Sequence, residues 1–268
     1  MCIITAARHG KNRSLCLTKT RDRAYNPRLT LCYTEHRGVA ILMYLDLETT
    51  WVEGINEYGL TVVNSALMVK RDEKEHKKGK GKGKTSQDSQ TMMSLLSCRD
   101  LDEALEMSRV NPLRGHTLIT DGRELVHTEY TSRSPYLEES LDTEGIHAYT
   151  NHGILIPKEG YPPTTDDGIS SRRRSQNALK ALNMRQGEPA DFLKLLPALR
   201  LQPGAKHPHD MIRDTEKMRT STQAIFCPDS RTLHLQLIEG KVDFRQDVYV
   251  QSDRATHVLR HEVSTWSG

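Results

Sequence analysis

Short runs of apolar and β-branched residues, separated by turn-forming residues, fill the first quarter of the chain. Such runs are typical of β-strands that are buried on at least one face. Residues 56–59, Asn-Glu-Tyr-Gly, follow the fourth run and predict a tight hairpin turn into the fifth. The predicted strands are CIITAA, LCLTKT, VAILMYL, TTWVEGI and LTVVNSAL.

Helical patterns occur in two blocks, and strand patterns follow each block. The first block predicts helices over residues 90–97 and 100–110, and the second over residues 170–184 and 190–199. This order favours an α+β fold with two packed antiparallel sheets and outer helices, because it lacks the regular alternation of a parallel Rossmann sheet. The later predicted strands are GHTLITD, ELVHTEY, IHAYT, STQAIFC, TLHLQLIE and DVYVQ.

The segment from Lys70 to Lys84 reads KRDEKEHKKGKGKGK and has no apolar residue that could pack in a core. It predicts a flexible, solvated loop at about residues 70–88, inserted within one domain that spans residues 1–268. The GKGKGK string lacks the GxxxxGK[ST] spacing of a phosphate-binding loop. Contact with an anionic surface is the alternative function for this loop.

The composition is that of a polar globular protein. Hydrophobic residues make up 36% of the chain and charged residues 27%, which excludes a disordered protein. A net charge of only +3 and an aromatic fraction of 5% give no reason to expect nucleic-acid binding, and no apolar run is long enough for a membrane span. The five cysteines are widely spaced and lack a CxxC pair, which predicts a reduced, cytoplasmic protein.

Cysteine is the second residue, and its chemistry at that position is specific. Removal of Met1 would leave a thiol and a free α-amine on one residue, with unperturbed pKa values of about 8.5 and roughly 7.7–8.0. The amine can accept the thiol proton near neutral pH, so Cys2 would supply both the nucleophile and its base. The alternative is a small buried residue that opens an edge strand.

The segment KTRDR ends the second predicted strand, close to the start of the first. We expect Asp22 to hydrogen-bond the α-amine of Cys2 and hold it in place. A cation, either Lys19 or Arg21, would stabilise the thiolate and the negative charge that develops during reaction. The alternative is a solvent-facing cluster of ion pairs at the strand end.

Together, MCIITAA and KTRDR resemble the choloylglycine hydrolase and penicillin-acylase superfamily of linear amide hydrolases. The resemblance extends along nearly the whole chain, and MRTSTQAIFCPDSRTLHL is similar to the closing hairpin of its acyltransferase branch. WVEGINEYGLTVVNSAL resembles a family hairpin that leads to an asparagine, which implies that Asn64 is an oxyanion-hole donor. AYTNHG is similar to a Thr-Asn motif and implies the same role for Asn151. DDGISSRRR resembles a Ser-Arg stretch that opens a helix, which implies that Arg172 holds Cys2 or the substrate.

This resemblance implies a fold and an activity. The fold is the four-layer αββα sandwich of the N-terminal-nucleophile hydrolases, with two antiparallel sheets between helix layers. The activity is hydrolysis of a linear carbon–nitrogen amide bond in a small N-acyl substrate through a Cys2 thioester, with no metal or organic cofactor. Asn64 and Asn151 would stabilise the oxyanion, and loss of one such donor typically costs about 10²–10³ in rate. A homo-oligomer is left open.

Three alternative functions are compatible with the same sequence features. An acyltransferase would use an amine in place of water. A non-catalytic protein would keep the fold alone, since the start also resembles the Asn-Arg-Asp-Glu motif family, although this chain lacks that tetrapeptide. A nucleic-acid-associated protein would use the lysine-rich loop. Family members commonly carry Arg-Asn-x-Asp where this chain has Lys-Thr-Arg-Asp, so the choice between Lys19 and Arg21 stays open.

Two pairs of histidines could suggest a metal site, but their spacing favours histidines at the surface. His207 and His209 lie in a loop rich in proline and glycine. His147 and His152 are too far apart in sequence to place both rings on one face of a helix. No HExxH motif completes either pair, so we expect no bound metal.

Overall fold

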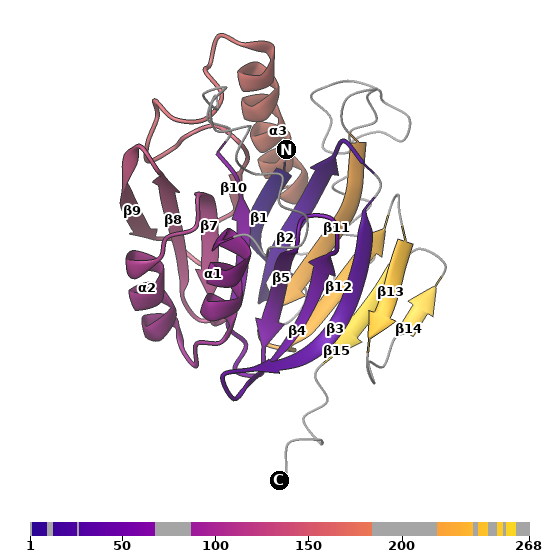
Figure 1. Ribbon diagram of the computed structural model, residues 1–268. Coiled ribbons are helices and arrows are strands. Elements are labelled where there is room, and N and C mark those ends of the chain that lie inside the picture. The colour runs from indigo at the N-terminus through magenta and orange to yellow at the C-terminus, as the bar shows by residue number, and fades with distance from the viewer. Residues whose placement is uncertain are drawn as a thin grey trace.

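The strand patterns of the sequence form two stacked β-sheets, and helices cover their outer faces in the computed structural model (Figure 1). Successive residues of a strand point to opposite faces of the sheet, and this fixes which neighbouring layer each side chain meets. The structure describes residues 2–9, 13–25, 27–67, 87–183, 219–237, 241–245, 251–253 and 256–260.

The first sheet contains the N-terminal strand in its interior, with the order β10-β1-β2-β11-β12-β15-β14. All of its pairs are antiparallel. Its strands are β1 (Cys2–His9), β2 (Ser14–Arg23), β10 (His147–Tyr149), β11 (Arg219–Cys227), β12 (Thr232–Leu237), β14 (Gln251–Asp253) and β15 (Thr256–Arg260).

The second sheet has the order β13-β3-β4-β5-β6-β7-β8-β9. Its pairs are antiparallel except for β13 and β3, which run parallel at one edge of the sheet. Its strands are β3 (Arg28–His36), β4 (Val39–Asp46), β5 (Trp51–Asn56), β6 (Thr61–Ser65), β7 (Gly115–Thr120), β8 (Leu125–Thr131), β9 (Ser134–Ser140) and β13 (Lys241–Arg245).

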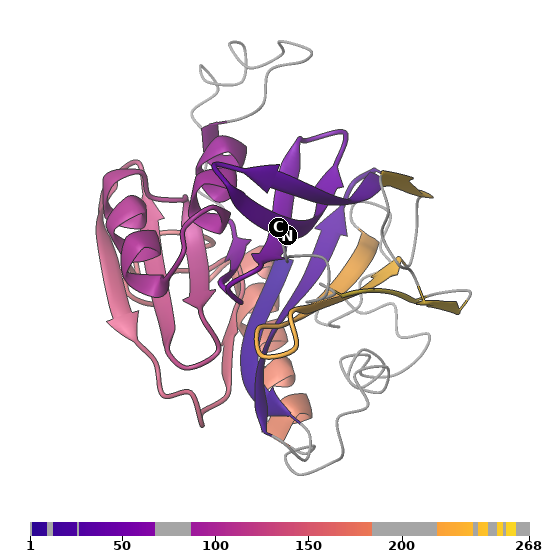
Figure 2. The same ribbon diagram turned by 90° about the horizontal axis from the view of Figure 1, so that it is seen from below.

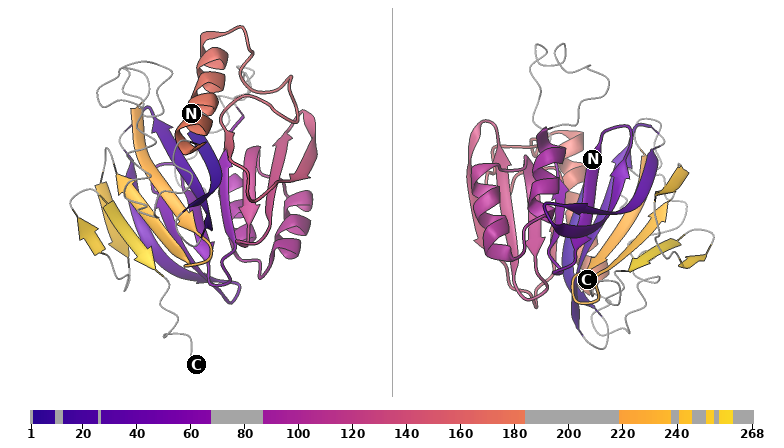
Figure 3. Two further views of the ribbon diagram at one scale, coloured as in Figure 1. Left: turned by 180° about the vertical axis from the view of Figure 1, so that it is seen from behind. Right: turned by 60° about the horizontal axis from the view of Figure 1, so that its bottom comes forward.

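Among the described residues, three helices complete four layers. The helices α1 (Gln87–Leu96) and α2 (Leu101–Val110) contact β5, β6 and β7, whereas α3 (Asp166–Asn183) contacts β1 and β10. Seen from below, α1 and α2 lie across the molecule from α3 (Figure 2), and from behind α3 covers the start of the first sheet (Figure 3). The αββα sandwich expected from the resemblance is therefore the observed fold.

Each interface between layers has its own apolar core. Ile4 belongs to the core between the two sheets, while its neighbour Ile3 packs with Ala178 and Leu182 under α3. This alternation follows from the period of two along a strand. It means that β1 and β2 present one face to the second sheet and the other to α3, and this division decides where each polar residue of β2 points.

The sequence located most of the described elements. The turn at 56–59 joins β5 to β6, and its Gly59 has a φ of +88°, a conformation that glycine adopts readily. The strands β3 and β9 were not predicted from the sequence. The predicted helix 190–199, the lysine-rich segment 70–84, most of the predicted strand DVYVQ, and His207 and His209 lie outside the described residues.

The sequence also predicted that no segment spans a membrane and that the cysteines are reduced. None of the helices among the described residues is both long and apolar enough to cross a membrane. All five cysteines are free thiols, although Cys16 and Cys227 face each other with their Sγ atoms 3.8 Å apart.

Candidate functional site

The first two strands pair as a hairpin whose register places Cys2 opposite Arg21 and Ile4 opposite Lys19. Residues opposite each other in an antiparallel pair share one face of the sheet. Cys2, Lys19 and Arg21 therefore face the second sheet, together with Ile4. Asp22 alternates with them and faces α3. The sequence predicted the proximity of this segment to Cys2 but not its division between the two faces.

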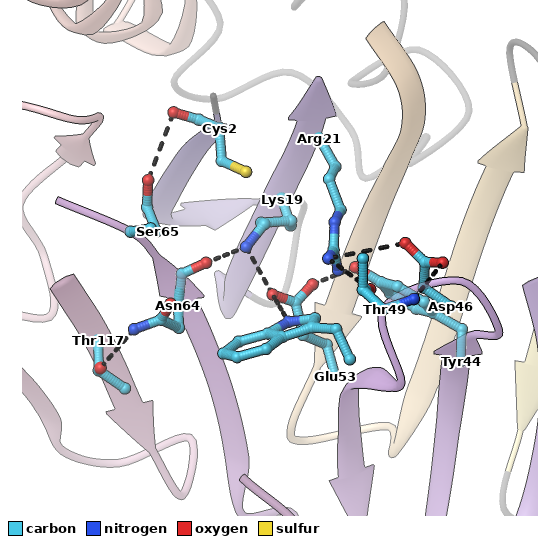
Figure 4. A network of polar contacts seen from close by, with 12 residues as sticks. Cys2, Lys19, Arg21, Tyr44, Asp46, Thr49, Glu53, Asn64, Ser65 and Thr117 are labelled. Atoms are coloured by element: carbon cyan, nitrogen blue, oxygen red, sulfur yellow. Dashed lines mark hydrogen bonds and ion pairs between the residues drawn. The ribbon is translucent and has the colours of Figure 1, made fainter. Parts of the chain in front are cut away.

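Lys19 is buried between the sheets, where its charge has a direct partner (Figure 4). Its Nζ lies 2.6 Å from Glu53 Oε1 and also donates a hydrogen bond to the backbone carbonyl of Asn64. Glu53 is fully buried in β5 and accepts further hydrogen bonds from the Tyr44 hydroxyl and, at 3.1 Å, from Trp51 Nε1. A buried ion pair of this kind needs such additional bonds to offset the loss of hydration. Lys19 thus ties the hairpin of Cys2 to the strand of Asn64.

Arg21 lies directly opposite Cys2 and is held more loosely than Lys19. Its Nη2 is 3.5 Å from Thr49 Oγ1 and 3.7 Å from Asp46 Oδ2, and its guanidinium lies 5.8 Å from the centre of the Trp51 ring. Its Nε and Nη1 are buried without a hydrogen-bond partner among the described residues. Burial would lower the pKa of the guanidinium, but the surrounding acidic groups, including the Cys2 thiol, raise it overall.

Asp22 makes a buried ion pair with a residue that the sequence did not single out. Its Oδ2 lies 2.8 Å from Arg174 Nη1, and neither side chain has exposed surface. Its other oxygen accepts a hydrogen bond of 2.7 Å from Thr220 Oγ1 on β11. Both partners are on the α3 side of the sheet, as the alternation along β2 requires.

The arginine expected at the start of the helix was Arg172, and the structure places a different one next to Asp22. Arg174 is fully buried, whereas Arg172 is only half-buried, and its Nη1 has no hydrogen-bond partner in the described part of the chain. Arg174, Ala178 and Leu182 are spaced four residues apart and form the buried face of α3. That spacing is the sequence signal that separates Arg174 from its neighbours.

The backbone nitrogen of Cys2 is bound by the side chain of Asn151, whereas the sequence predicted that Asp22 would bind it. The Cys2 N–H donates to Asn151 Oδ1 at 3.2 Å. The amide of Asn151 is fixed in turn, because its Nδ2 donates to the backbone carbonyl of Ala66 at 2.6 Å and its backbone N–H donates to Ser171 Oγ at 3.0 Å. Ser65 Oγ donates to Cys2 O at 3.4 Å. The Cys2 nitrogen therefore has a rigid acceptor.

Asn64 lies on β6 next to Ser65, but its side chain is turned toward β7. Its Nδ2 donates to Thr117 Oγ1 at 3.0 Å and to the backbone carbonyl of Arg114 at 3.2 Å (Figure 4). Both amide hydrogens are thus directed at protein acceptors. The backbone carbonyl of Asn64 accepts a hydrogen bond from Lys19, while its side-chain amide is directed at β7 and the Arg114 carbonyl rather than at Cys2.

His152 is not at the surface, so that expectation is wrong. It is buried, and its Nδ1 lies 3.0 Å from both Thr150 Oγ1 and Ser171 Oγ. Burial, and then the charge of Arg172, lower its pKa to about 4. His147 is half-buried on β10. A polar network of β10, the following loop and α3 therefore surrounds Asn151.

Comparison with known proteins gives a fold but no close relative. No family model and no curated protein matches the sequence. Among solved structures, penicillin V acylase from Agrobacterium tumefaciens matches with a TM-score of 0.52 and 12% identity, over 89% of this chain and 83% of that one. The Caenorhabditis elegans ortholog of N-acylethanolamine-hydrolyzing acid amidase matches with a TM-score of 0.55 and 12% identity, over 85% and 93%. The chain has the N-terminal-nucleophile hydrolase fold.

A third match is a mutant of the conjugated bile acid hydrolase from Clostridium perfringens, with a TM-score of 0.54 and 14% identity over 89% of each chain. Identities of this size establish the fold alone. The N-terminal-nucleophile fold is thus shared over most of the chain, and the roles of individual residues rest on the geometry described above.

Proposed function

We propose that this protein hydrolyses a linear carbon–nitrogen amide bond in a small N-acyl substrate, with Cys2 as the nucleophile after removal of Met1. The observation that carries the proposal is the hydrogen bond of 3.2 Å from the backbone nitrogen of Cys2 to Asn151 Oδ1. A free amine at that position would be held beside its own thiol. The fold and the three amide-hydrolysing proteins that share it support the same assignment.

The reaction would run in two stages. The Cys2 amine takes the thiol proton, the sulfur attacks the carbonyl carbon, and the carbonyl oxygen becomes an oxyanion. When the carbon–nitrogen bond breaks, the ammonium of Cys2 returns the proton to the leaving amine. Water then attacks the thioester, with the same amine as base, and releases the acid and the thiol.

Of the two candidate cations, we assign the electrostatic role to Arg21. It lies opposite Cys2 in the register, and its buried Nε and Nη1 have donors to offer a thiolate or a substrate oxygen. Lys19 is already paired with Glu53 and with the Asn64 carbonyl, so it acts as a positioning residue. Asp22 would position the hairpin through Arg174 rather than bind the amine.

The oxyanion would be stabilised by amide donors that are redirected when substrate binds. Asn64 Nδ2 would exchange its longer bond, the 3.2 Å contact with the Arg114 carbonyl, for the substrate oxygen. Asn151 would keep its bond to the Cys2 nitrogen, and Arg172, with a buried and unused Nη1, would contact the substrate. We further propose a cytoplasmic location, since the five cysteines are free thiols.

The test combines N-terminal mass analysis with a screen of N-acyl amides for amine release. A chain that begins at Cys2 should be alkylated by iodoacetamide at that residue first. Cys2→Ala should retain the fold and lose on the order of 10⁶ in kcat, as when a nucleophile that acts together with its base is removed. Cys98→Ala is the matched control, because burial raises the pKa of its thiol to about 12.

The same assay separates the alternatives. An acyltransferase would transfer the acyl group to added amines faster than to water. Full activity in Cys2→Ala, or a native chain that retains Met1 entirely, would rule out the mechanism. A processed chain that reacts with iodoacetamide and cleaves none of the amides would favour a non-catalytic protein with this fold.

A further inference from the structure

A buried cluster of two histidines and a glutamate lies on β7 and β8, outside the candidate amidase site. His116 is paired with Glu129 in the strand register, and His127 lies two residues before Glu129 on the same strand, so the three side chains share one face. One ligand atom from each residue lies within 4.8 Å of the others, and all three residues are fully buried. The sequence motifs did not single out this cluster.

The outer hydrogen bonds of the two rings determine where their protons lie. His116 Nε2 is 2.7 Å from the backbone carbonyl of His152, which can only accept, so this nitrogen carries a hydrogen. His127 Nδ1 is 2.8 Å from the Glu139 carboxylate and carries a hydrogen for the same reason. In neutral rings, His116 Nδ1 and His127 Nε2 are then both unprotonated.

These two unprotonated nitrogens face each other at 3.0 Å. Two lone pairs at this distance repel unless a positive species lies between them or beside them. A proton would make one ring an imidazolium in a fully buried site, where a charged group loses its hydration. A divalent cation removes the repulsion without protonating either ring.

We propose that His116 Nδ1, His127 Nε2 and a Glu129 carboxylate oxygen bind a divalent transition-metal ion of the Zn²⁺ class. Zinc accepts two histidines and a glutamate at about 2.0–2.2 Å, and ligands at that distance in a tetrahedron lie roughly 3.4 Å apart. His116 Nδ1 lies 3.0 Å from His127 Nε2 and 3.5 Å from Glu129 Oε2, and these two distances bracket the expected separation of the ligands. This site departs from the expectation of a protein without metal.

The surroundings match those of metal sites in proteins. Histidine ligands usually donate their outer N–H to a carboxylate or a backbone carbonyl, which are the groups that His127 and His116 contact. Tyr149 stacks on the His127 ring, with centroids 4.0 Å apart, and its ring is tilted against that of His116 at 5.3 Å. Glu129 balances the charge of the cation.

The position of the cluster gives the ion a structural role. Glu129 accepts backbone N–H bonds of 2.7–3.2 Å from residues 154–156, and His116 binds the carbonyl of His152. Both anchors lie directly after Asn151 in the chain. A bound ion would therefore hold the loop that follows the acceptor of the Cys2 nitrogen, and this inference does not depend on the proposed amidase activity.

The experiment uses the full chain, freed of metal with a chelator and then dialysed against Zn²⁺ or Co²⁺. We expect one ion per chain by mass spectrometry of the metal, a higher melting temperature in the Zn²⁺-loaded form, and a Co²⁺ spectrum with d–d bands of a site of low coordination number but without thiolate charge-transfer bands. The absence of those thiolate bands excludes the cysteines as ligands.

Glu139→Gln and Glu138→Gln form the matched pair of variants. Glu139 is partly exposed and contacts the outer nitrogen of His127, whereas its neighbour Glu138 binds Arg109. Glu139→Gln should weaken Zn²⁺ binding by about 10–100-fold, and Glu138→Gln should leave it unchanged. Glu129→Ala should abolish binding. A folded wild-type chain that binds neither ion would overturn the proposal and assign a shared proton to the histidine pair. Binding that survives Glu129→Ala would overturn it as well, because the ion would then not use the proposed ligand set.

Discussion

The sequence predicted a site role for Arg172, whereas the structure places Arg174 of the same helix beside Asp22. Replacing Arg174 by Met tests whether the Arg174 charge stabilises the buried Asp22 carboxylate. Methionine keeps most of the volume and the helix propensity of arginine but removes the charge. The variant would remove the charged partner of the buried Asp22 carboxylate and leave its hydrogen bond of 2.7 Å from Thr220 Oγ1 in place. The free energy of unfolding should therefore fall sharply.

The magnitude follows from the burial of both partners. The Arg174 and Asp22 side chains have 0% exposed surface and an N–O separation of 2.8 Å. Removing one partner of a buried pair costs about 3–5 kcal/mol, because the remaining charge is desolvated without compensation. For a protein whose total stability is about 5–15 kcal/mol, this is a large fraction. The corresponding loss in melting temperature is roughly 6–20 °C for a chain of this size.

The assay is urea unfolding followed by circular dichroism, with Arg172→Met as the control on the same helix. Arg172 is half-buried, and its replacement should change the unfolding free energy by under about 1 kcal/mol. Asp22→Asn alone should cost about 2–3 kcal/mol, and the double variant should cost no more than Arg174→Met alone, so the coupling energy equals the cost of Asp22→Asn, about 2–3 kcal/mol. Equal effects of Arg172→Met and Arg174→Met, or a coupling near zero, would refute the assignment.

Two further predictions concern turns that position the strands. Asn56→Ala removes four hydrogen bonds between a buried side chain and backbone groups, and it should lower the unfolding free energy by about 3 kcal/mol in thermal melts; a loss under about 1 kcal/mol would contradict this. Gly115→Ala should cost about 2–6 kcal/mol in urea unfolding, because Gly115 has a φ of +112° and a Cβ would lie 2.2 Å from the Ser65 carbonyl oxygen. The control is Gly38→Ala, which has open space around it and should cost only about 1–2 kcal/mol.

The layers of the fold were predictable because they follow from local patterns. Runs of alternating or continuous apolar residues gave the strands of the Cys2 hairpin and most of the second sheet. The strand β9 was missed because it lies at the edge of the second sheet and has mostly half-buried or exposed positions, so its apolar signal is weak. The strand β3 was missed because it begins with the exposed Arg28 and its second half carries polar residues.

The site was predictable only where its residues are close in sequence. Cys2 and the KTRDR segment meet through one hairpin, so their proximity follows from the strand order. The contact of Cys2 with Asn151 joins residues 149 positions apart, and only the resemblance pointed to it. Glu53 gave a signal that could have been used, since a carboxylate in the middle of the apolar run WVEGIN needs a buried partner.

The buried charges near Cys2 distinguish a functional site from a part of the fold that serves stability alone. Lys19, Glu53, Asp22 and Arg174 are charged and almost fully buried, next to apolar cores on both faces of the first sheet. Well-packed apolar residues of similar volume would stabilise such positions as well or better, so stability alone does not explain these charges. They lie on β2, on the strand beside β6 and on α3, which are the elements that fix Cys2, Asn64 and Asn151 relative to one another. Polar residues that cost stability and lie on the elements around Cys2 are the pattern expected of a functional site, and they support the proposed role of Cys2.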